Sequence, residues 1–185
     1  MGFLGVGKTT AIKQLLAHKP QDERWAVLVN EFGEIGVDGT LIRNGVNNDI
    51  AVRQIPGGCM CCAAGPVTQV TLNNLLRQER PDRLLLEPSG LGHPAEILRL
   101  LRAPEYQGVL QVRDVITLLD PRHVIQPRYQ EHRLFKEQLR VAEQVVLNKI
   151  DLCDPADLAL ARTWLNTQLP PQTPRHEVEQ GKLSM

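Results

Sequence analysis

Short apolar runs that favour β-strands alternate along this chain with amphipathic stretches of helical period. Because the runs lack the polar alternation of a half-exposed strand, they are typical of strands buried on both faces of a parallel sheet. The candidate strands are 26–29, 84–86, 115–119 and 145–147. This pattern predicts an α/β fold of three layers, a mostly parallel sheet flanked by helices, with ligands bound beyond the carboxyl ends of the strands.

The candidate helices span 9–16, 67–76 and 158–169, and each has an apolar side that we expect to face the sheet. The residues of these sides are Ile12, Leu15 and Leu16 in the first, Val67, Val70 and Leu75 in the second, and Ala161, Trp164 and Leu165 in the third. The tail 170–185, which contains three prolines, suits a loop that leads into a last short strand.

Composition restricts the classes of protein to which the chain can belong. Its 185 residues are 42% hydrophobic and 23% charged, which predicts one domain over 1–185. Twenty-one Lys and Arg balance twenty-one Asp and Glu, so we expect neither a nucleic acid nor a membrane as partner. Because no apolar run approaches the roughly 20 residues that span a bilayer, and no signal peptide opens the chain, a cytoplasmic protein is expected.

The segment 2–9 reads GFLGVGKT and matches the phosphate-binding pattern G-x-x-x-x-G-K-[ST]. Backbone N–H groups of such a loop converge on phosphates, and the helix that follows points its positive end at the anion. In this role Lys8 contacts the β- and γ-phosphates and the Thr9 hydroxyl binds Mg²⁺. The predicted nucleotide contacts in this segment are Gly2, Gly5, Val6, Gly7, Lys8, Thr9 and Thr10.

A second nucleotide signal, Asn148-Lys149-Ile150-Asp151, follows the candidate strand 145–147 directly. The carboxylate of Asp151 can accept hydrogen bonds from both the N1–H and the exocyclic amine of guanine, whereas adenine offers no matching pair of donors. We therefore predict GTP rather than ATP as the nucleotide, with Asn148, Lys149 and Asp151 near the base.

A strand end lies between these two motifs, where 84–90 reads LLLEPSG. Glu87 is predicted to act near Mg²⁺, and the N–H of Gly90 is placed where a γ-phosphate would be sensed. Together with Lys8 and Thr9, Glu87 completes the predicted catalytic set.

Three cysteines, Cys59, Cys61 and Cys62, fall within four positions of a chain that has only one other cysteine. Because thiolates are soft ligands that suit Zn²⁺ or Cu(I), metal binding is the favoured interpretation. The alternative is a buried structural cluster or a redox pair. Three thiolates leave a tetrahedral ion one ligand short. Candidate fourth donors are Glu31, Glu34, Asp38 and His93.

The segment 30–39 (NEFGEIGVDG) is rich in glycine and acidic residues and follows a candidate strand. Its plain interpretation is a surface loop. In a P-loop GTPase, however, a switch that coordinates Mg²⁺ belongs here, and Glu34 or Asp38 could serve as the ligand.

Together the segments GFLGVGKTT, NEFGEIGVDG, GCMCC, EPSG and NKID resemble those of the CobW-type metal-chaperone GTPases, relatives of the nickel-insertion GTPases. The resemblance implies a P-loop GTPase domain that binds GTP and Mg²⁺ and holds Zn²⁺ or a related ion at the three clustered cysteines. It also implies a slow hydrolysis that is coupled to delivery of the ion to a client metalloprotein.

The chain departs from the family in two respects. Only Met1 precedes the P-loop, so we expect the first strand to be truncated, and the smaller carboxyl-terminal domain of the family is not expected within 1–185. Two other functions stay open from the sequence. One is a metal-binding module without enzymatic activity whose nucleotide site is incomplete, and the other is a P-loop ATPase or kinase with structural cysteines.

Overall fold

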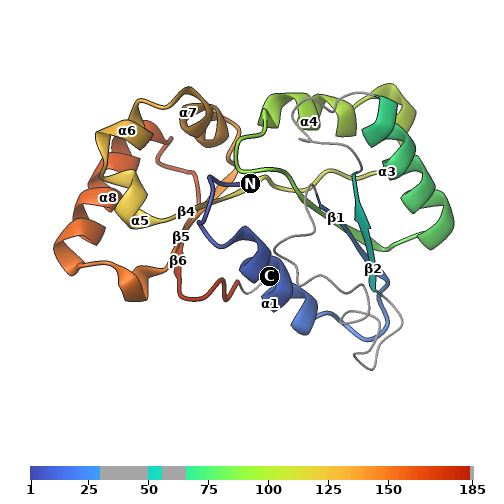
Figure 1. Ribbon diagram of the computed structural model, residues 1–185, viewed down its shortest axis with the longest axis horizontal. Helices are drawn as coiled ribbons and strands as arrows, with labels where there is room; N and C mark the ends of the chain where they lie inside the picture. The colour runs from blue at the N-terminus through green and yellow to red at the C-terminus, as the bar shows by residue number, and fades with distance from the viewer. Residues whose placement is uncertain (30–49, 56–65, 184–185) are drawn as a thin grey trace.

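A computed structural model describes residues 1–29, 50–55 and 66–183 of the chain, and it has the predicted parallel α/β architecture (Figure 1). The described strands form two parallel sheets of three strands each, in the orders β2-β1-β3 and β4-β5-β6. Their bounds are Trp25–Val29 (β1), Ile50–Gln54 (β2), Arg83–Glu87 (β3), Ile116–Leu119 (β4), Gln144–Asn148 (β5) and Arg175–Val178 (β6). All four candidate strands and the short last strand are confirmed, whereas β2 was not predicted.

Helices lie on the sheets, and many of them begin with proline, which is favoured at the first helical position. The helix bounds are Lys8–Ala17 (α1), Pro66–Glu79 (α3), Pro94–Leu101 (α4), Pro121–Val124 (α5), Pro127–Gln130 (α6), Arg133–Arg140 (α7) and Pro155–Gln168 (α8). Short 3₁₀ turns occupy Pro104–Tyr106 and Ile150–Leu152. The three candidate helices are confirmed as α1, α3 and α8.

The predicted buried side of α3 is wrong in part. Val67 and Val70 are 50% and 57% exposed, whereas Thr68, Leu72 and Leu75 are buried. Positions 68, 72 and 75 follow one another at the four- and three-residue spacing that keeps side chains on one helix face, which 67, 70 and 75 do not. The spacing therefore decides which residues of α3 face the sheet.

Helices cover both faces of the β1 sheet, which explains why β1 is apolar at every position. Ala26 and Leu28 pack in one cluster with residues of α3 and α4. Val27 and Val29 pack on the other face with Ile12 of α1. Successive side chains of a strand point to opposite faces, so a strand buried on both sides needs an uninterrupted apolar run. The three-layer arrangement follows from this.

Two predicted site residues stand at the carboxyl ends of parallel strands, one in each sheet. Glu87 ends β3 opposite Val29 of β1, and Asn148 ends β5 beside Val178 of β6. Because parallel strands share one direction, their carboxyl ends and the loops that follow lie together. The predicted site residues on these ends can therefore meet the P-loop.

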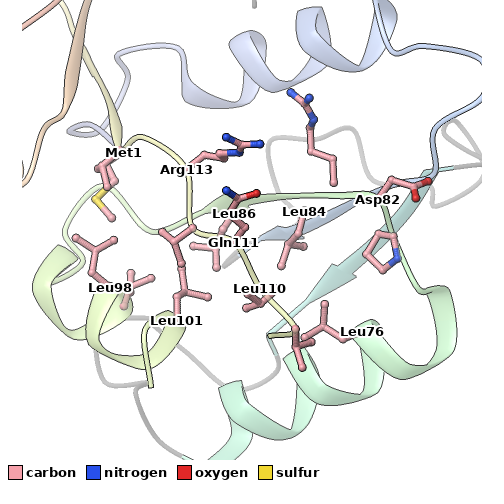
Figure 2. Close-up of a pocket in the computed structure, with 16 residues that line it drawn as sticks. Met1, Leu76, Asp82, Leu84, Leu86, Leu98, Leu101, Leu110, Gln111 and Arg113 are labelled. Atoms are coloured by element: carbon pink, nitrogen blue, oxygen red, sulfur yellow. The ribbon is translucent and has the colours of Figure 1, made fainter. Parts of the chain in front are cut away.

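A pocket of about 450 Å³ separates β3 from the segment that leads into β4. Figure 2 shows Met1 at one end of it, Leu84 and Leu86 of β3 along one side, and Leu98 of α4 nearby. The backbone of Met1 accepts a hydrogen bond from the Leu118 N–H at 2.9 Å, on the edge of β4 that β5 does not use. Leu84 and Leu86 of β3 thus line this pocket, and Met1, at its end, bonds to the edge of β4.

We predict that an extension of about ten β-prone apolar residues before Met1 will raise the melting temperature and reduce aggregation. The extension would pair with the edge groups of β3 and β4 and bury the apolar lining, and unpaired edges favour aggregation. In a chain of this size, each kcal/mol gained raises the melting temperature by roughly 2–4 °C. A Gly/Ser extension of equal length is the control for calorimetry. Equal melting temperatures for the two extended chains would contradict the prediction.

Candidate nucleotide site

The P-loop turns sharply into α1 and lies against the end of β5. Gly7 caps α1 with a φ of 95°, in the left-handed region that favours glycine. A Cβ at this position would lie 2.5 Å from the Asn148 amide nitrogen, so a larger residue would collide with that side chain. The first turn of α1 consequently presents its N–H groups at the loop, as a phosphate site requires.

The predicted phosphate and Mg²⁺ residues are close to one another. The Lys8 ammonium donates to the carbonyl of Phe3 at 3.0 Å. The Thr9 hydroxyl donates to a carboxylate oxygen of Glu87 at 2.9 Å, although the two residues are 78 positions apart. Thr9 and Glu87 therefore offer two oxygen ligands in one place, which suits a hard cation such as Mg²⁺.

Gly90 lies directly on the backbone of the P-loop. It is buried, and a Cβ on it would lie 2.7 Å from the Leu4 nitrogen and 2.9 Å from the Phe3 carbonyl carbon. Only glycine permits so close an approach. The structure thus places the loop after β3 beside the P-loop, where the sequence predicts contact with the γ-phosphate.

The buried side chain of Asn148 connects the P-loop to the loop that follows β6. Its amide nitrogen donates to the carbonyl of Val6 at 2.9 Å, and its amide oxygen accepts from the Gly181 N–H at 2.9 Å. Asn148 is 1% exposed, so water competes little for these bonds. The Asn148 side chain therefore holds the P-loop and the loop after β6 together.

Lys149 makes a second connection between the 148–151 segment and the P-loop. Its φ of 65° is rare for a residue other than glycine, and its ammonium donates to the carbonyl of Gly5 at 2.5 Å. The ammonium also lies 3.6 Å from a carboxylate oxygen of Asp120. These contacts hold the 148–151 segment in a fixed position beside the P-loop.

An open cavity of about 360 Å³ lies between these two segments. Exposed Asp151 is at its rim, as the guanine prediction requires. The residues that line the cavity are Gly7, Thr10, Gln14, Asn148, Lys149, Asp151, Leu152 and Gln180. The cavity has space for a purine ring, with a carboxylate at its edge.

Gln180 and Asp120 were not predicted as site residues from the sequence. Gln180 reaches the cavity because it and Gly181 have φ values of 50° and 69°, which turn the chain after β6 back toward α1. The Gln-Gly pair after an expected strand was the available signal. Asp120 directly follows β4 and caps α5, and the sequence Leu-Leu-Asp-Pro was a recognisable strand end followed by a helix start.

The side chain of Asp120 is fully buried and bound by cations. Two nitrogens of the Arg122 guanidinium lie 3.0 and 2.8 Å from its carboxylate oxygens. Burial alone would raise the pKa of this carboxyl, but hydrogen bonds from Arg122 and its charge outweigh burial and lower the pKa below 3.8. Asp120 is therefore an anion at neutral pH and attracts Lys149.

The predicted metal ligands lie mostly outside the described residues. This holds for Cys59, Cys61 and Cys62, and for Glu31, Glu34 and Asp38. His93 is described at the start of α4, where its Nδ1 lies 3.2 Å from a carboxylate oxygen of Glu137. In the described part of the chain, no group of three or more His, Cys, Asp or Glu is placed to hold a metal ion.

Comparison with known proteins decides the family. The family model of the CobW/HypB/UreG nucleotide-binding domain matches residues 1–176. The chain belongs to this family. The zinc chaperone YeiR of Escherichia coli is 51% identical over 164 residues, which are 88% of this chain and 49% of that protein. The zinc chaperone CobW of Pseudomonas aeruginosa is 32% identical over 212 residues, which cover 100% of this chain and 56% of the relative.

The solved structures agree with the family assignment at the level of the fold. A zinc-bound triple mutant of the YjiA GTPase superposes with a TM-score of 0.66 at 22% identity, over 100% of this chain and 57% of that one. The CobW-family chain thus spans about half the length of the curated relatives that it matches. Within the described residues, no helix is long and apolar enough to cross a membrane.

We predict that Asp120→Asn will lower the free energy of unfolding at pH 7 by about 1–3 kcal/mol, since it removes the buried anion that Arg122 and Lys149 face. The pKa of Asp120 is lower in the folded chain than its ordinary value of 3.8. Its contribution is therefore complete above that pH and is lost as the pH falls through the lowered pKa. The difference between variant and wild type should shrink in acid, as measured by urea unfolding at several pH values.

Asp114→Asn is the matched control, because the Asp114 carboxylate is exposed and accepts a hydrogen bond from the Gln144 amide at 2.8 Å. Its effect should stay within about 0.5 kcal/mol. An Asp120→Asn difference that is the same at pH 7 and in acid would show that the charge of Asp120 does not stabilise the fold.

Proposed function

We propose that this CobW-family chain binds GTP and hydrolyses it slowly, and that it couples hydrolysis to delivery of Zn²⁺ or a similar ion to a client metalloprotein. One observation carries the proposal: Asn148 and Lys149 are bonded to the P-loop around a cavity that has Asp151 at its rim. A phosphate loop and a guanine-reading carboxylate are thereby held at one edge of the sheet. The relatives YeiR and CobW are zinc chaperones, which supports the metal-delivery part of the proposal.

The phosphates would be bound at the start of α1. Bound Mg²⁺ would neutralise charge on the β- and γ-phosphate oxygens. Thr9 and Glu87, whose side-chain oxygens are 2.9 Å apart, would hold the ion directly or through water. Lys8 would leave the Phe3 carbonyl for the phosphates, and Gly90 would present its N–H to the γ-phosphate. These groups stabilise charge that develops in the transition state, which accounts for catalysis.

The base would lie in the cavity between Thr10 and Asp151. The Asp151 carboxylate accepts two hydrogen bonds from guanine and can offer no donor to adenine. The Asn148 and Lys149 contacts fix the backbone that carries Asp151, so the carboxylate is held in position before the nucleotide arrives.

The transferred ion is cargo in this proposal. Cys59, Cys61 and Cys62 would bind it as thiolates. A fourth ligand from the acidic segment that contains Glu34 and Asp38 would depend on the nucleotide, because that segment is the proposed Mg²⁺ switch. The released ion would pass to a client metalloprotein.

Asp151→Asn should weaken GTP binding by a few kcal/mol, because an amide nitrogen would then face the donors of guanine. The variant should gain affinity for xanthosine nucleotides, which present an acceptor at the altered position. Competition binding with GTP, ATP and the xanthosine nucleotide measures both effects. Unchanged GTP affinity would remove the guanine assignment, and preference for ATP in the wild type would favour an ATPase or kinase.

Zinc affinity should differ between the chain saturated with GDP and the chain saturated with a non-hydrolysable GTP analogue. By linkage, zinc must change GTP affinity by the same factor, which is roughly 5- to 150-fold in coupled systems. Replacement of Cys59, Cys61 and Cys62 by Ser should abolish zinc binding and leave GTP affinity almost unchanged. A chelating dye in competition measures the zinc affinity.

Two controls accompany this measurement. Cys153→Ser should leave zinc affinity unchanged, since Cys153 lies apart from the cluster in sequence. Lys8→Ala should remove the nucleotide dependence and the hydrolysis but keep zinc binding. Equal zinc affinities in the two nucleotide states of the wild type would contradict the coupling, and zinc binding without any GTP binding would indicate a metal-binding module.

A further inference from the structure

Helix α7 contacts both parts of the chain that would surround the terminal phosphate, and no predicted nucleotide contact lies on it. Phe135 of α7 packs edge to face against Phe3 of the P-loop, with ring centroids 6.2 Å apart. On the same helix, Glu137 lies 3.2 Å from His93, just after the loop that follows β3. The helix is thus placed to connect the two loops.

The central contact of α7 is a buried hydrogen bond from Gln138. The amide nitrogen of Gln138 donates to the carbonyl of Gly90 at 2.9 Å. Gln138 is 2% exposed, and its backbone carbonyl accepts from the Thr117 hydroxyl of β4 at 3.2 Å. The base of this side chain is thereby fixed to the sheet while its tip holds Gly90.

The Gln138 side chain lowers the stability of the fold in one respect, which a purely structural role does not explain. The amide oxygen of Gln138 is buried and has no hydrogen-bond partner among the described residues. A buried acceptor without a partner opposes folding, and an apolar side chain of the same size would avoid that cost. Among the described residues, the hydrogen bond that the amide makes is the one to the Gly90 carbonyl.

At Gly90 the loop after β3 lies against the P-loop. A Cβ added to Gly90 would lie only 2.7 Å from the Leu4 nitrogen. The Gly90 carbonyl accepts a hydrogen bond from Gln138, and the Cα of Gly90 packs against the P-loop. Rotation of the backbone at Gly90 would therefore break the Gln138 hydrogen bond or collide with Leu4. The pair of contacts fixes the direction of the N–H that would meet a γ-phosphate.

We infer that Gln138 is a positioning residue that fixes the Gly90 loop in the orientation that favours a nucleoside triphosphate over a diphosphate. This inference rests on the proposed function, since it needs Gly90 to meet the γ-phosphate. Gln138 touches no nucleotide itself. It acts by lowering the cost of ordering Gly90 before the triphosphate binds.

Gln138→Met tests the inference, because it keeps the length of the side chain, removes the donor and removes the buried acceptor. Affinities for GDP and for a non-hydrolysable GTP analogue, both with Mg²⁺, are measured with fluorescent nucleotides. The loss of one hydrogen bond should weaken analogue binding by about threefold to tenfold. Because GDP has no γ-phosphate, its affinity should stay within about twofold.

Gln130→Met is the matched control, since the Gln130 amide also donates to a backbone carbonyl, that of Val124 at 2.8 Å, which is not a carbonyl of the loop after β3. It should leave the ratio of the two affinities unchanged. An unchanged ratio in Gln138→Met, or equal loss of both affinities, would overturn the positioning role. Absence of any triphosphate preference in the wild type would overturn the proposed use of Gly90 as well.

A second measurement on the wild-type chain avoids dependence on the fold of the variant. Hydrogen exchange in 133–140 and 88–93 should slow together when the GTP analogue replaces GDP. Exchange in α8, which has no contact with Gly90 in the described hydrogen bonds, serves as the reference. Slowing of 88–93 without any change in 133–140 would show that the loop responds to the nucleotide independently of Gln138.

Discussion

The arrangement of the candidate nucleotide site depends on the buried side-chain amide of Asn148. Its two hydrogen bonds join the P-loop at Val6, the end of β5 and the turn at Gly181, which are far apart in the sequence. Both bonds are shielded from water, so loss of either leaves a buried polar group without a partner. This one side chain joins the P-loop and the Gly181 turn beside the cavity that we propose for the base.

An ion pair also stabilises the connection between the end of β5 and the P-loop. Buried Asp120 is kept ionised by Arg122 and lies 3.6 Å from Lys149, whose ammonium bonds to the P-loop. The proposed base side of the site is therefore held by the Asn148 amide and the Lys149–Asp120 ion pair. On the phosphate side, Gln138 binds the carbonyl of Gly90. The P-loop is thus held on one side by Lys149 and on the other by the Gly90 loop that Gln138 binds, and all of these residues come later in the chain.

Much of the fold could be predicted because strands buried on both faces must be apolar throughout. The rule holds for β1, β4 and β5, whose residues are mostly buried, whereas β3 was found from its run of three leucines although these are only half-buried. β2 is also half-buried and contains Arg53 and Gln54, so it lacked the apolar run. The helices α5 and α6 are only four residues each, too short for a periodic signal. Valines at 67 and 70 looked buried by residue type, but the spacing of Thr68, Leu72 and Leu75 fixed the face of α3.

The sequence by itself determined the local parts of the site. The P-loop depends on glycine torsions and on the N–H groups of the helix that follows, and Asp151 depends on the strand that ends before it, so neighbouring residues suffice to predict them. Only the tertiary structure decided which groups support them. Asp120, Gln138 and Gln180 reach the site through strand register and helix packing. Lys149 and Gly90, which Asp120 and Gln138 contact, lie tens of residues from them in the sequence, and no local pattern encodes these contacts.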